Sequence, residues 1–208
     1  MIIRQIQVGG MAVFAYIVGD RASGEALAID PAANVAEILK EAERDGLAIR
    51  YIVNTHAHPD HTGGNAEMKE RTGAAIVIHE ADAQMLTSIP SAYLRMFGAR
   101  PSPPADLTVR DGSELKVGET TLTVIHTPGH TPGGMCLHAD GAVFTGDTLF
   151  VGGVGRTDLP GGSWDVMAAS IREKLFSLPD STVVYPGHNY GSSPASTIGH
   201  EKSNNPYI

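Results

Sequence analysis

The side chains best suited to chemistry in this 208-residue chain gather in one short motif, His56-Ala57-His58-Pro59-Asp60-His61. Imidazole and carboxylate groups are the usual protein ligands of zinc and of related divalent metals. Side chains two positions apart on an extended backbone point the same way, so His56 and His58 can converge on one ion. Asp60 and His61 follow a proline and can turn toward a second ion. This motif can therefore begin two adjacent metal positions.

Further ligand-type residues are expected on loops that directly follow apolar strands. The segment before the motif is apolar and β-branched, and three later segments share this character; the four are residues 51–55, 122–126, 142–145 and 182–185. The last three run into loops rich in Gly or Pro, which carry His130, Asp147 and His188 respectively. Taken alone, each of these residues would be typical of an ordinary turn with no function. Because all three occupy the same place beyond a strand, we expect them to share one site with the motif.

Four segments that carry these ligand-type residues resemble the motifs of the metallo-β-lactamase superfamily, and in particular those of its glyoxalase II (hydroxyacylglutathione hydrolase) branch. The matching segments are residues 55–65, 127–131, 144–150 and 186–190. The resemblance implies that His56, His58 and His130 hold one metal. It also implies that Asp60, His61 and His188 hold a second metal, and that Asp147 bridges the two.

The resemblance further implies an activity and a substrate. Two divalent ions, with zinc expected and iron or manganese as alternatives, would supply metal-bound hydroxide and polarise a carbonyl group. Asp147 and Asp60 are the expected catalytic carboxylates. The implied reaction is hydrolysis of an activated acyl bond in a small-molecule thioester such as S-D-lactoylglutathione.

Three further residues are expected to contact the substrate. The segment Gly155-Arg156-Thr157-Asp158 stands where glyoxalase II enzymes carry a Gly-Lys-x-Tyr motif that binds glutathione. Arg156 keeps the positive charge of the family lysine, whereas Asp158 lacks the phenol of the family tyrosine. Arg156 is expected either to bind a carboxylate of the thiol carrier or to form an ion pair with Asp158. Tyr190 matches a family tyrosine that contacts the thiol carrier. Lys202 is a further candidate, with a solvated lysine of the chain end as the alternative.

Other functions stay open at this point. Persulfide dioxygenases of the same superfamily also resemble this chain, and they hold one iron with side chains that match His56, His130 and Asp147. Residues 62–65 and 146–150 look more like those of the hydrolases, which favours thioester hydrolysis. Lactone hydrolysis and a non-catalytic metal-binding role are lesser alternatives.

The order of expected elements indicates an α/β protein. Strand-like segments at 2–8, 12–18 and 25–30 precede an amphipathic stretch at 34–45, which Asn34 is expected to cap. Further helices are expected at residues 62–71, 80–87 and 163–176. The pattern alone also fits a doubly wound sheet. The resemblance selects an αββα sandwich, formed by residues 1–208 as one domain.

Two segments bear on the substrate pocket. The insert at 80–104 contains four large apolar residues, Met85, Tyr93, Met96 and Phe97, which are expected either to wall the pocket or to form helix core. The chain ends 18 residues after Tyr190, so it resembles the short bacterial glyoxalase II-like hydrolases that lack a helical carboxyl-terminal domain. The thiol carrier of such enzymes need not be glutathione.

The composition argues against several other classes of protein. The chain has 15 Lys and Arg against 23 Asp and Glu, a net charge of −8, which disfavours a nucleic-acid surface. A single cysteine, Cys136, rules out an internal disulfide, and the amino terminus lacks the apolar core of a signal peptide, so a cytoplasmic location is expected. No apolar run approaches the roughly 18–20 residues that span a bilayer, so no membrane partner is expected.

Overall fold

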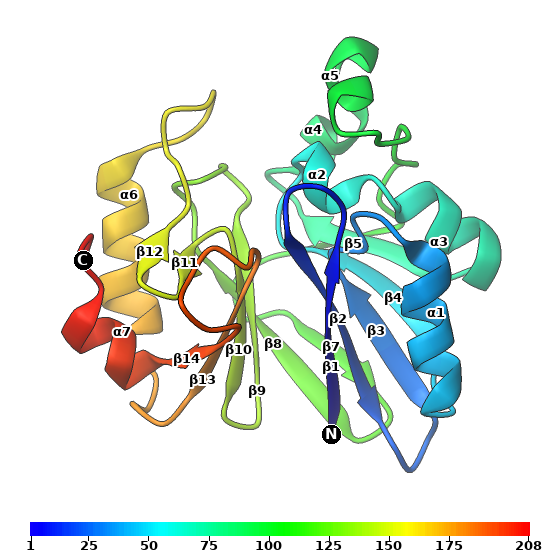
Figure 1. The fold of residues 1–208 in the computed structure, drawn as a ribbon, viewed down its shortest axis with the longest axis horizontal. Coiled ribbons are helices and arrows are strands. Elements are labelled where there is room, and N and C mark those ends of the chain that lie inside the picture. Colours follow the sequence, from blue (N-terminus) through cyan, green and yellow to red (C-terminus); the bar gives the residue numbers. More distant parts are fainter.

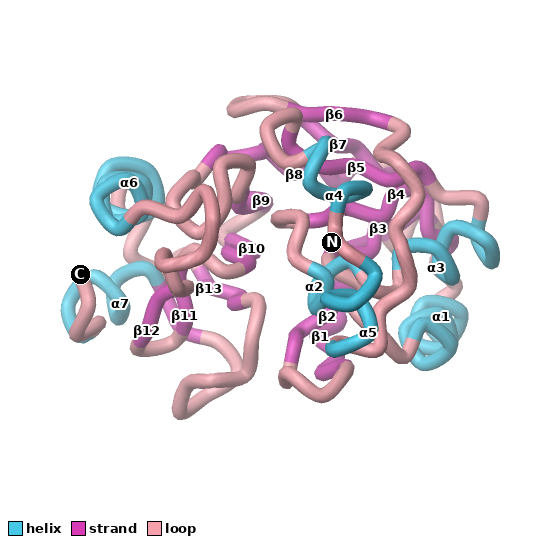
Figure 2. The backbone as a smooth tube through the Cα atoms, turned by 90° about the horizontal axis from the view of Figure 1, so that it is seen from above, coloured by secondary structure: helices cyan, strands magenta, loops and turns pink.

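The computed structural model describes residues 1–208, and its strands form two facing sheets with helices on both outer sides (Figures 1 and 2). The first sheet has the strand order β1-β2-β3-β4-β5-β6, and the second has the order β14-β13-β10-β9-β8-β7. The strands of the first sheet are β1 (Ile2–Val8), β2 (Val13–Asp20), β3 (Glu25–Ile29), β4 (Ala48–Asn54), β5 (Ala75–His79) and β6 (Leu107–Val109). Those of the second are β7 (Glu114–Val117), β8 (Thr120–His126), β9 (Met135–Ala139), β10 (Ala142–Gly146), β13 (Val183–Pro186) and β14 (Ser196–Thr197). A small hairpin of β11 (Leu149–Phe150) and β12 (Gly153–Val154) stands beside the second sheet.

The helices fall into three groups (Figure 1). The outer face of the first sheet is covered by α1 (Val35–Arg44) and α3 (Asn65–Thr72). The second sheet is covered by α6 (Trp164–Ala169), its π-helical continuation η1 (Ser170–Leu175), and α7 (Ile198–Asn204). Three short helices lie at the upper end of the first sheet in Figure 1: α2 (Pro59–Thr62), α4 (Ala83–Ser88) and α5 (Ser91–Met96). No helix combines the length and the apolar character that crossing a membrane requires.

Strand β2 shows how one segment builds two apolar layers, because every one of its residues is buried. Its odd-numbered residues from Val13 to Ile17 belong to the core beneath α1 and α3. Its even-numbered residues from Phe14 to Val18 belong to the core between the two sheets. This alternation follows from the two-residue repeat of a strand. A third core lies between the second sheet and α6, η1 and α7, so the order of layers confirms the predicted αββα sandwich.

The structure refines two of the predicted helices. The expected helix at 62–71 corresponds to α3, which begins at Asn65 after Gly63 and Gly64. The backbone of Gly64 passes too close to the Pro31 carbonyl for any larger residue. Asn34 occupies the predicted N-cap position of α1, but its side chain forms no capping hydrogen bond. It adopts a left-handed conformation with a φ of 54°, and its side-chain oxygen accepts a hydrogen bond from the Gly9 amide at 3.2 Å.

The topology brings the loops that follow six strands to one rim of the sandwich. Strands β3, β4 and β5 are parallel neighbours, so the loops after them leave the same edge of the first sheet. In the second sheet β10 and β13 are parallel, and β8 runs the same way because β9 is antiparallel to both β8 and β10. The residues beyond these strand ends therefore face one another.

Candidate metal centre

The structure brings together the side chains of all seven residues expected to bind metal: six form two groups of three, and Asp147 lies between the groups. Ligand atoms within each group lie within 4.8 Å of one another; the groups are His56, His58 and His130, and Asp60, His61 and His188. The motif contributes to both groups because α2 begins at Pro59, which suits the first turn of a helix, and turns the following residues away from the strand direction.

The first group joins the loop after β4 to the loop after β8. The Nδ1 atom of His58 lies 2.8 Å from the Nε2 atom of His130. The ring of His56 lies edge-on to both, with centroid distances of 4.8 Å to His58 and 4.7 Å to His130. Two ring nitrogens at such a short separation must share either a proton or a cation.

The second group joins α2 to the loop after β13. The Nε2 atoms of His61 and His188 are 3.1 Å apart. The Oδ2 atom of Asp60 lies 3.8 Å from the Nε2 atom of His61 and 3.6 Å from that of His188. One carboxylate oxygen and two imidazole nitrogens therefore face a common point, which is the donor set expected for a divalent metal.

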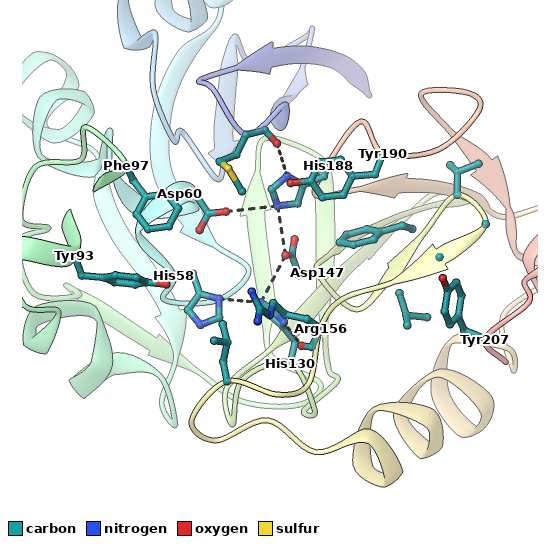
Figure 3. A pocket seen from close by; sticks show the side chains of 17 residues that line it. His58, Asp60, Tyr93, Phe97, His130, Asp147, Arg156, His188, Tyr190 and Tyr207 are labelled. Atoms are coloured by element: carbon teal, nitrogen blue, oxygen red, sulfur yellow. Dashed lines mark hydrogen bonds and ion pairs between the residues drawn. The ribbon is translucent and has the colours of Figure 1, made fainter. Parts of the chain in front are cut away.

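Asp147 stands between the two groups (Figure 3). Its Oδ1 atom is 3.2 Å from the Nε2 atom of His61, and its Oδ2 atom is 3.6 Å from the Nε2 atom of His130. Oδ2 is also 3.4 Å from the Nε2 atom of His188. Gly146 allows this placement because it adopts a φ of 47°, which a larger residue would disfavour. The carboxylate therefore has the position that a bridging ligand requires.

Hydrogen bonds on the far side of three imidazole rings fix which nitrogen is free. Each Nδ1 donates to an oxygen that can only accept: His130 to the Arg156 carbonyl at 2.7 Å, His188 to the Met11 carbonyl at 2.8 Å, and His61 to the Asp30 carboxylate at 3.0 Å. The lone pair of each Nε2 atom is consequently left for the site. Such outer contacts orient metal-binding histidines and increase their basicity.

His56 is oriented in the same way through Thr55. The Thr55 hydroxyl donates to Asp30 at 2.6 Å, so it can accept a hydrogen bond from Nδ1 of His56 at 3.1 Å. The Nε2 atom of His56 and the Oδ1 atom of Asp147 are both buried without a hydrogen-bond partner. Buried polar atoms are rarely left unsatisfied, so two such atoms beside converging histidines fit a site for cations.

The charges of the site favour a cation as well. Burial would lower the pKa of His61, but the carboxylates of Asp147, Asp30 and Asp60 outweigh it and raise this pKa well above its usual value. Burial would raise the pKa of Asp147, but His61 and His188 hold it well below the usual range. The Asp147 carboxylate therefore stays charged, and a proton on His61 competes with metal for the same position.

The first group is already prepared for metal. Burial, together with the neighbouring His130, lowers the pKa of His58 to about 4. Burial also lowers the pKa of His56 well below its ordinary value, with His61 and His130 contributing. Neutral imidazole is the form that binds metal, so these side chains hold their lone pairs available at neutral pH.

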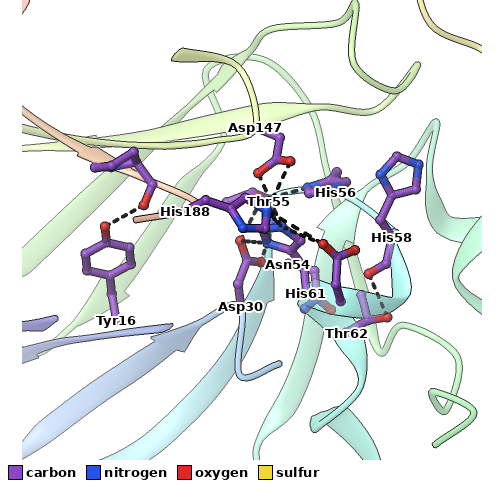
Figure 4. Close-up of polar contacts among 12 residues, drawn as sticks. Tyr16, Asp30, Asn54, Thr55, His56, His58, His61, Thr62, Asp147 and His188 are labelled. Atoms are coloured by element: carbon purple, nitrogen blue, oxygen red, sulfur yellow. Dashed lines mark hydrogen bonds and ion pairs between the residues drawn. The ribbon is translucent and has the colours of Figure 1, made fainter. Parts of the chain in front are cut away.

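Asp30 is a positioning residue that the motifs did not indicate (Figure 4). It lies directly beyond β3 and is 1% exposed. Its carboxylate accepts hydrogen bonds from the Thr55 amide at 2.8 Å, from the Thr55 hydroxyl and from His61. One buried acid thus orients ligands of both groups. The only sign of this role in the sequence is an acidic residue directly after a strand-like segment.

Asp82 does a similar task for the backbone of two loops. It follows β5, is fully buried, and accepts hydrogen bonds from the Ala57 amide at 3.1 Å, the Thr131 hydroxyl at 2.8 Å and the Gly133 amide at 2.6 Å. Ala57 lies between the first two ligands of the motif, and Thr131 follows His130. Asp82 therefore ties together the two loops that form the first group.

A cavity of about 430 Å³ opens beside the ligands and contains two of the three expected substrate contacts. Arg156 lines it while also holding Asp158 with two hydrogen bonds of 2.7 Å, so the two roles expected for this arginine are compatible. Tyr190 lines it too, with its ring stacked on His188 at a centroid distance of 4.4 Å. Phe150 meets the Tyr190 ring edge-on.

The structure does not bring Lys202 to this cavity and leaves it at the surface, which is the alternative considered for that residue. Its ammonium group donates to the Phe176 carbonyl at 3.3 Å and lies 3.7 Å from Asp180. The wall near the chain end is formed instead by Tyr207. In Figure 3 Tyr207 and Tyr190 lie on one side of the cavity and Tyr93 and Phe97 on the other.

The four large apolar residues of the 80–104 insert have different environments. Tyr93 and Phe97 line the cavity, whereas Met85 is partly buried against the core of the first sheet. Met96 is 78% exposed and lies outside this cavity.

The family of the chain follows from comparison with known proteins. A family model described as the metallo-beta-lactamase superfamily matches residues 8–188. The chain therefore belongs to that superfamily, which confirms the resemblance carried by the motifs. Its relatives are metal-dependent enzymes that include hydrolases and oxidoreductases.

Three relatives illustrate this range. The hydroxyacylglutathione hydrolase GloC of Haemophilus influenzae is 37% identical over 86% of this chain and 85% of its own length. The mitochondrial persulfide dioxygenase ETHE1 of Homo sapiens is 34% identical over 100% of this chain and 76% of its own length. Among solved structures, TTHA1623 in a di-iron-bound form has a TM-score of 0.86 and 32% identity, covering 99% of this chain and 100% of that one. These likenesses and the ligand groups support bound divalent metal.

Proposed function

We propose that this protein hydrolyses a small-molecule thioester, of the kind represented by S-D-lactoylglutathione, at a centre of two divalent metal ions. The observation that carries the proposal is the Asp147 carboxylate, which lies between two complete groups of ligands. Two groups of ligands on either side of one carboxylate suit two ions better than one. The similarity to GloC supports the hydrolase, and the di-iron relative supports two ions.

The residues of the chain would divide the work between chemistry and recognition. Bound divalent ions supply hydroxide at neutral pH and polarise the carbonyl of the thioester. Asp147, whose Oδ1 atom has no hydrogen-bond partner, can accept a hydrogen bond from the attacking nucleophile, as can Asp60, which also lines the cavity. A thiolate leaves readily, so the site needs no additional acid to protonate it.

Recognition of the thiol carrier falls to Arg156 and Tyr190. The Nε and Nη2 atoms of Arg156 hold Asp158, which leaves Nη1 to bind a carboxylate of the substrate. Burial raises the pKa of Tyr190, with Asp147 and Asp60 contributing, so its hydroxyl stays protonated as a hydrogen-bond donor. A cation and a neutral donor beside the ligands suit an anionic thiol carrier.

Persulfide oxidation is the second candidate, and the full-length similarity to ETHE1 favours it. In that case one iron would be held by the residues matching His56, His130 and Asp147. A two-histidine, one-carboxylate set is typical of mononuclear iron oxygenases. The second ligand group would then be dispensable, and this difference separates the two functions.

The decisive experiment combines metal analysis with two assays on protein purified without added metal. The hydrolase should contain about two metal ions per chain and cleave S-D-lactoylglutathione, and His61→Ala should reduce both the metal content and the turnover. The dioxygenase would contain one iron and consume oxygen with glutathione persulfide. One tightly bound iron, with His61→Ala harmless to turnover, would refute the proposed hydrolase.

A further inference from the structure

A second cavity of about 440 Å³ adjoins the one that contains the metal ligands. The two cavities share three lining residues, His58, Tyr93 and Leu159. His58 belongs to the first ligand group, so this second cavity opens directly beside the reacting centre. In Figure 3 Tyr93 and His58 lie together on the side of the site away from Tyr190.

The two cavities differ in chemistry. The first is lined by Arg156 and by the carboxylates of Asp60 and Asp147. The second has no Asp, Glu, Lys or Arg in its lining, and its wall is formed largely by Met85, Ile89 and prolines of the 80–104 insert and the 159–160 loop. An apolar group that enters it would leave water without losing a polar partner.

We infer that the second cavity binds the acyl group of the thioester and that this acyl group is apolar and several carbons long. The inference rests on the proposed hydrolase and specifies its substrate. The polar thiol carrier would lie toward Arg156, and the acyl chain would pass His58 between Tyr93 and Leu159. A lactoyl group, which is short and carries a hydroxyl, would leave the apolar cavity largely unfilled.

Chain length is the variable that tests this subsite. Each methylene group that leaves water should improve binding by about threefold to fourfold until the cavity is full. We would measure binding of S-methyl-, S-butyl- and S-hexylglutathione by calorimetry, since these thioethers cannot be hydrolysed. We would also measure kcat/KM for the acetyl, butanoyl and hexanoyl thioesters of glutathione and of the neutral thiol N-acetylcysteamine.

A pair of neighbouring variants in α4 gives a matched comparison. Ser88 lines the second cavity and Thr87 lines neither, yet both are exposed and each hydroxyl donates at 3.3 Å to the carbonyl three residues earlier. Ser88→Trp should fill the cavity and abolish the increase in affinity with chain length, whereas Thr87→Trp should retain this increase. Ile89→Asn, which makes the wall polar without filling it, should reduce the gain and provides a second test if Ser88→Trp fails to fold.

The outcomes separate the subsite from the proposed function. Equal affinity of wild-type protein for all chain lengths, or the same gain in Ser88→Trp as in wild type, would overturn the subsite. If hydrolysis occurs but its rate is independent of chain length, the subsite fails and the thioesterase stands. If the thioethers show the expected gain but no thioester is cleaved, the thioesterase fails and the apolar subsite stands.

Discussion

Replacing Asp82 should weaken both the fold and the metal centre, although this residue touches no metal ligand side chain. Its buried carboxylate accepts three hydrogen bonds, from the Ala57 amide, the Thr131 hydroxyl and the Gly133 amide. Asp82→Ala would leave these donors unpaired within the fold. A hydrogen bond to a charged group contributes about 1.5–3 kcal/mol, and such losses are not fully additive, so we expect a loss of about 4–6 kcal/mol in the free energy of unfolding.

Asp82→Asn should be milder for a reason visible in the geometry. Ala57 and Gly133 donate to different oxygens of the carboxylate, and an amide can present an oxygen to only one of them. In either orientation one backbone N–H would face an amino group. One lost bond to a charged acceptor corresponds to about 1.5–3 kcal/mol. Metal affinity should fall by about tenfold to a hundredfold, as for other residues that position ligands indirectly.

Urea unfolding followed by circular dichroism gives the stability, and competition with a chromophoric chelator gives the metal affinity. Glu80→Gln is the matched control, because Glu80 lies two residues away and pairs with Arg110 on the surface at 2.6 Å. Exposed pairs of this kind contribute at most about 1 kcal/mol. If Asp82→Asn matched Glu80→Gln in both measurements, Asp82 could not be the link between the two loops.

Three other predictions address separate parts of the molecule. Asp147→Asn should lower both the metal content and the activity, because the Asp147 carboxylate faces both ligand groups. Elemental analysis measures the metal content, and loss of activity with full metal content would contradict a bridging role. Arg156→Ala should raise KM for a glutathione thioester by about tenfold or more with little change in kcat, as expected for loss of a charge-assisted hydrogen bond. The control Asp158→Asn should leave KM unchanged. An unchanged KM in Arg156→Ala would mean that Arg156 only pairs with Asp158. Burial raises the pKa of the Cys136 thiol to about 11 from its usual 9.0, so the folded protein should resist a thiol-specific reagent at pH 8 and react once unfolded in urea. Because this pKa is higher in the folded state, the resulting stabilisation is complete below pH 9 and is lost as the pH rises through 11, so alkaline titration should destabilise wild type more than Cys136→Ala.

The metal ligands could be predicted from the sequence because their signal is local. Four ligand-type side chains within residues 56–61 are dense enough to stand out, and His130, Asp147 and His188 each follow a strand-like run. Their assembly into two groups required the topology, which the family resemblance supplied. Helix and strand propensities alone could not have shown that the two sheets face each other.

Asp30 and Asp82 escaped prediction because a single acid beyond a strand is ordinary turn chemistry. What distinguishes Asp30 and Asp82 is that each follows a strand adjacent to β4, the strand that leads to the metal-binding motif. Strands β3 and β5 flank β4 on either side, so the loop that carries His56 and His58 lies between two acid-bearing loops. Each carboxylate then reaches the central loop from its own side, through Thr55 and Ala57 respectively. This relation depends on strand order, which no local pattern records.

Lys202 lies away from the first cavity for a geometric reason in α7. Adjacent residues of a helix point about 100° apart, so Lys202 cannot share the inward direction of Glu201. Glu201 is 1% exposed and accepts a hydrogen bond from the Gly152 amide at 2.9 Å, and Asn205, one turn later, donates to the Gly153 carbonyl at 3.0 Å. Gly152 lies in the turn between β11 and β12, Gly153 begins β12, and both line the first cavity. The final helix therefore shapes the substrate pocket by fixing one of its walls, and it does so through a buried acid and an amide.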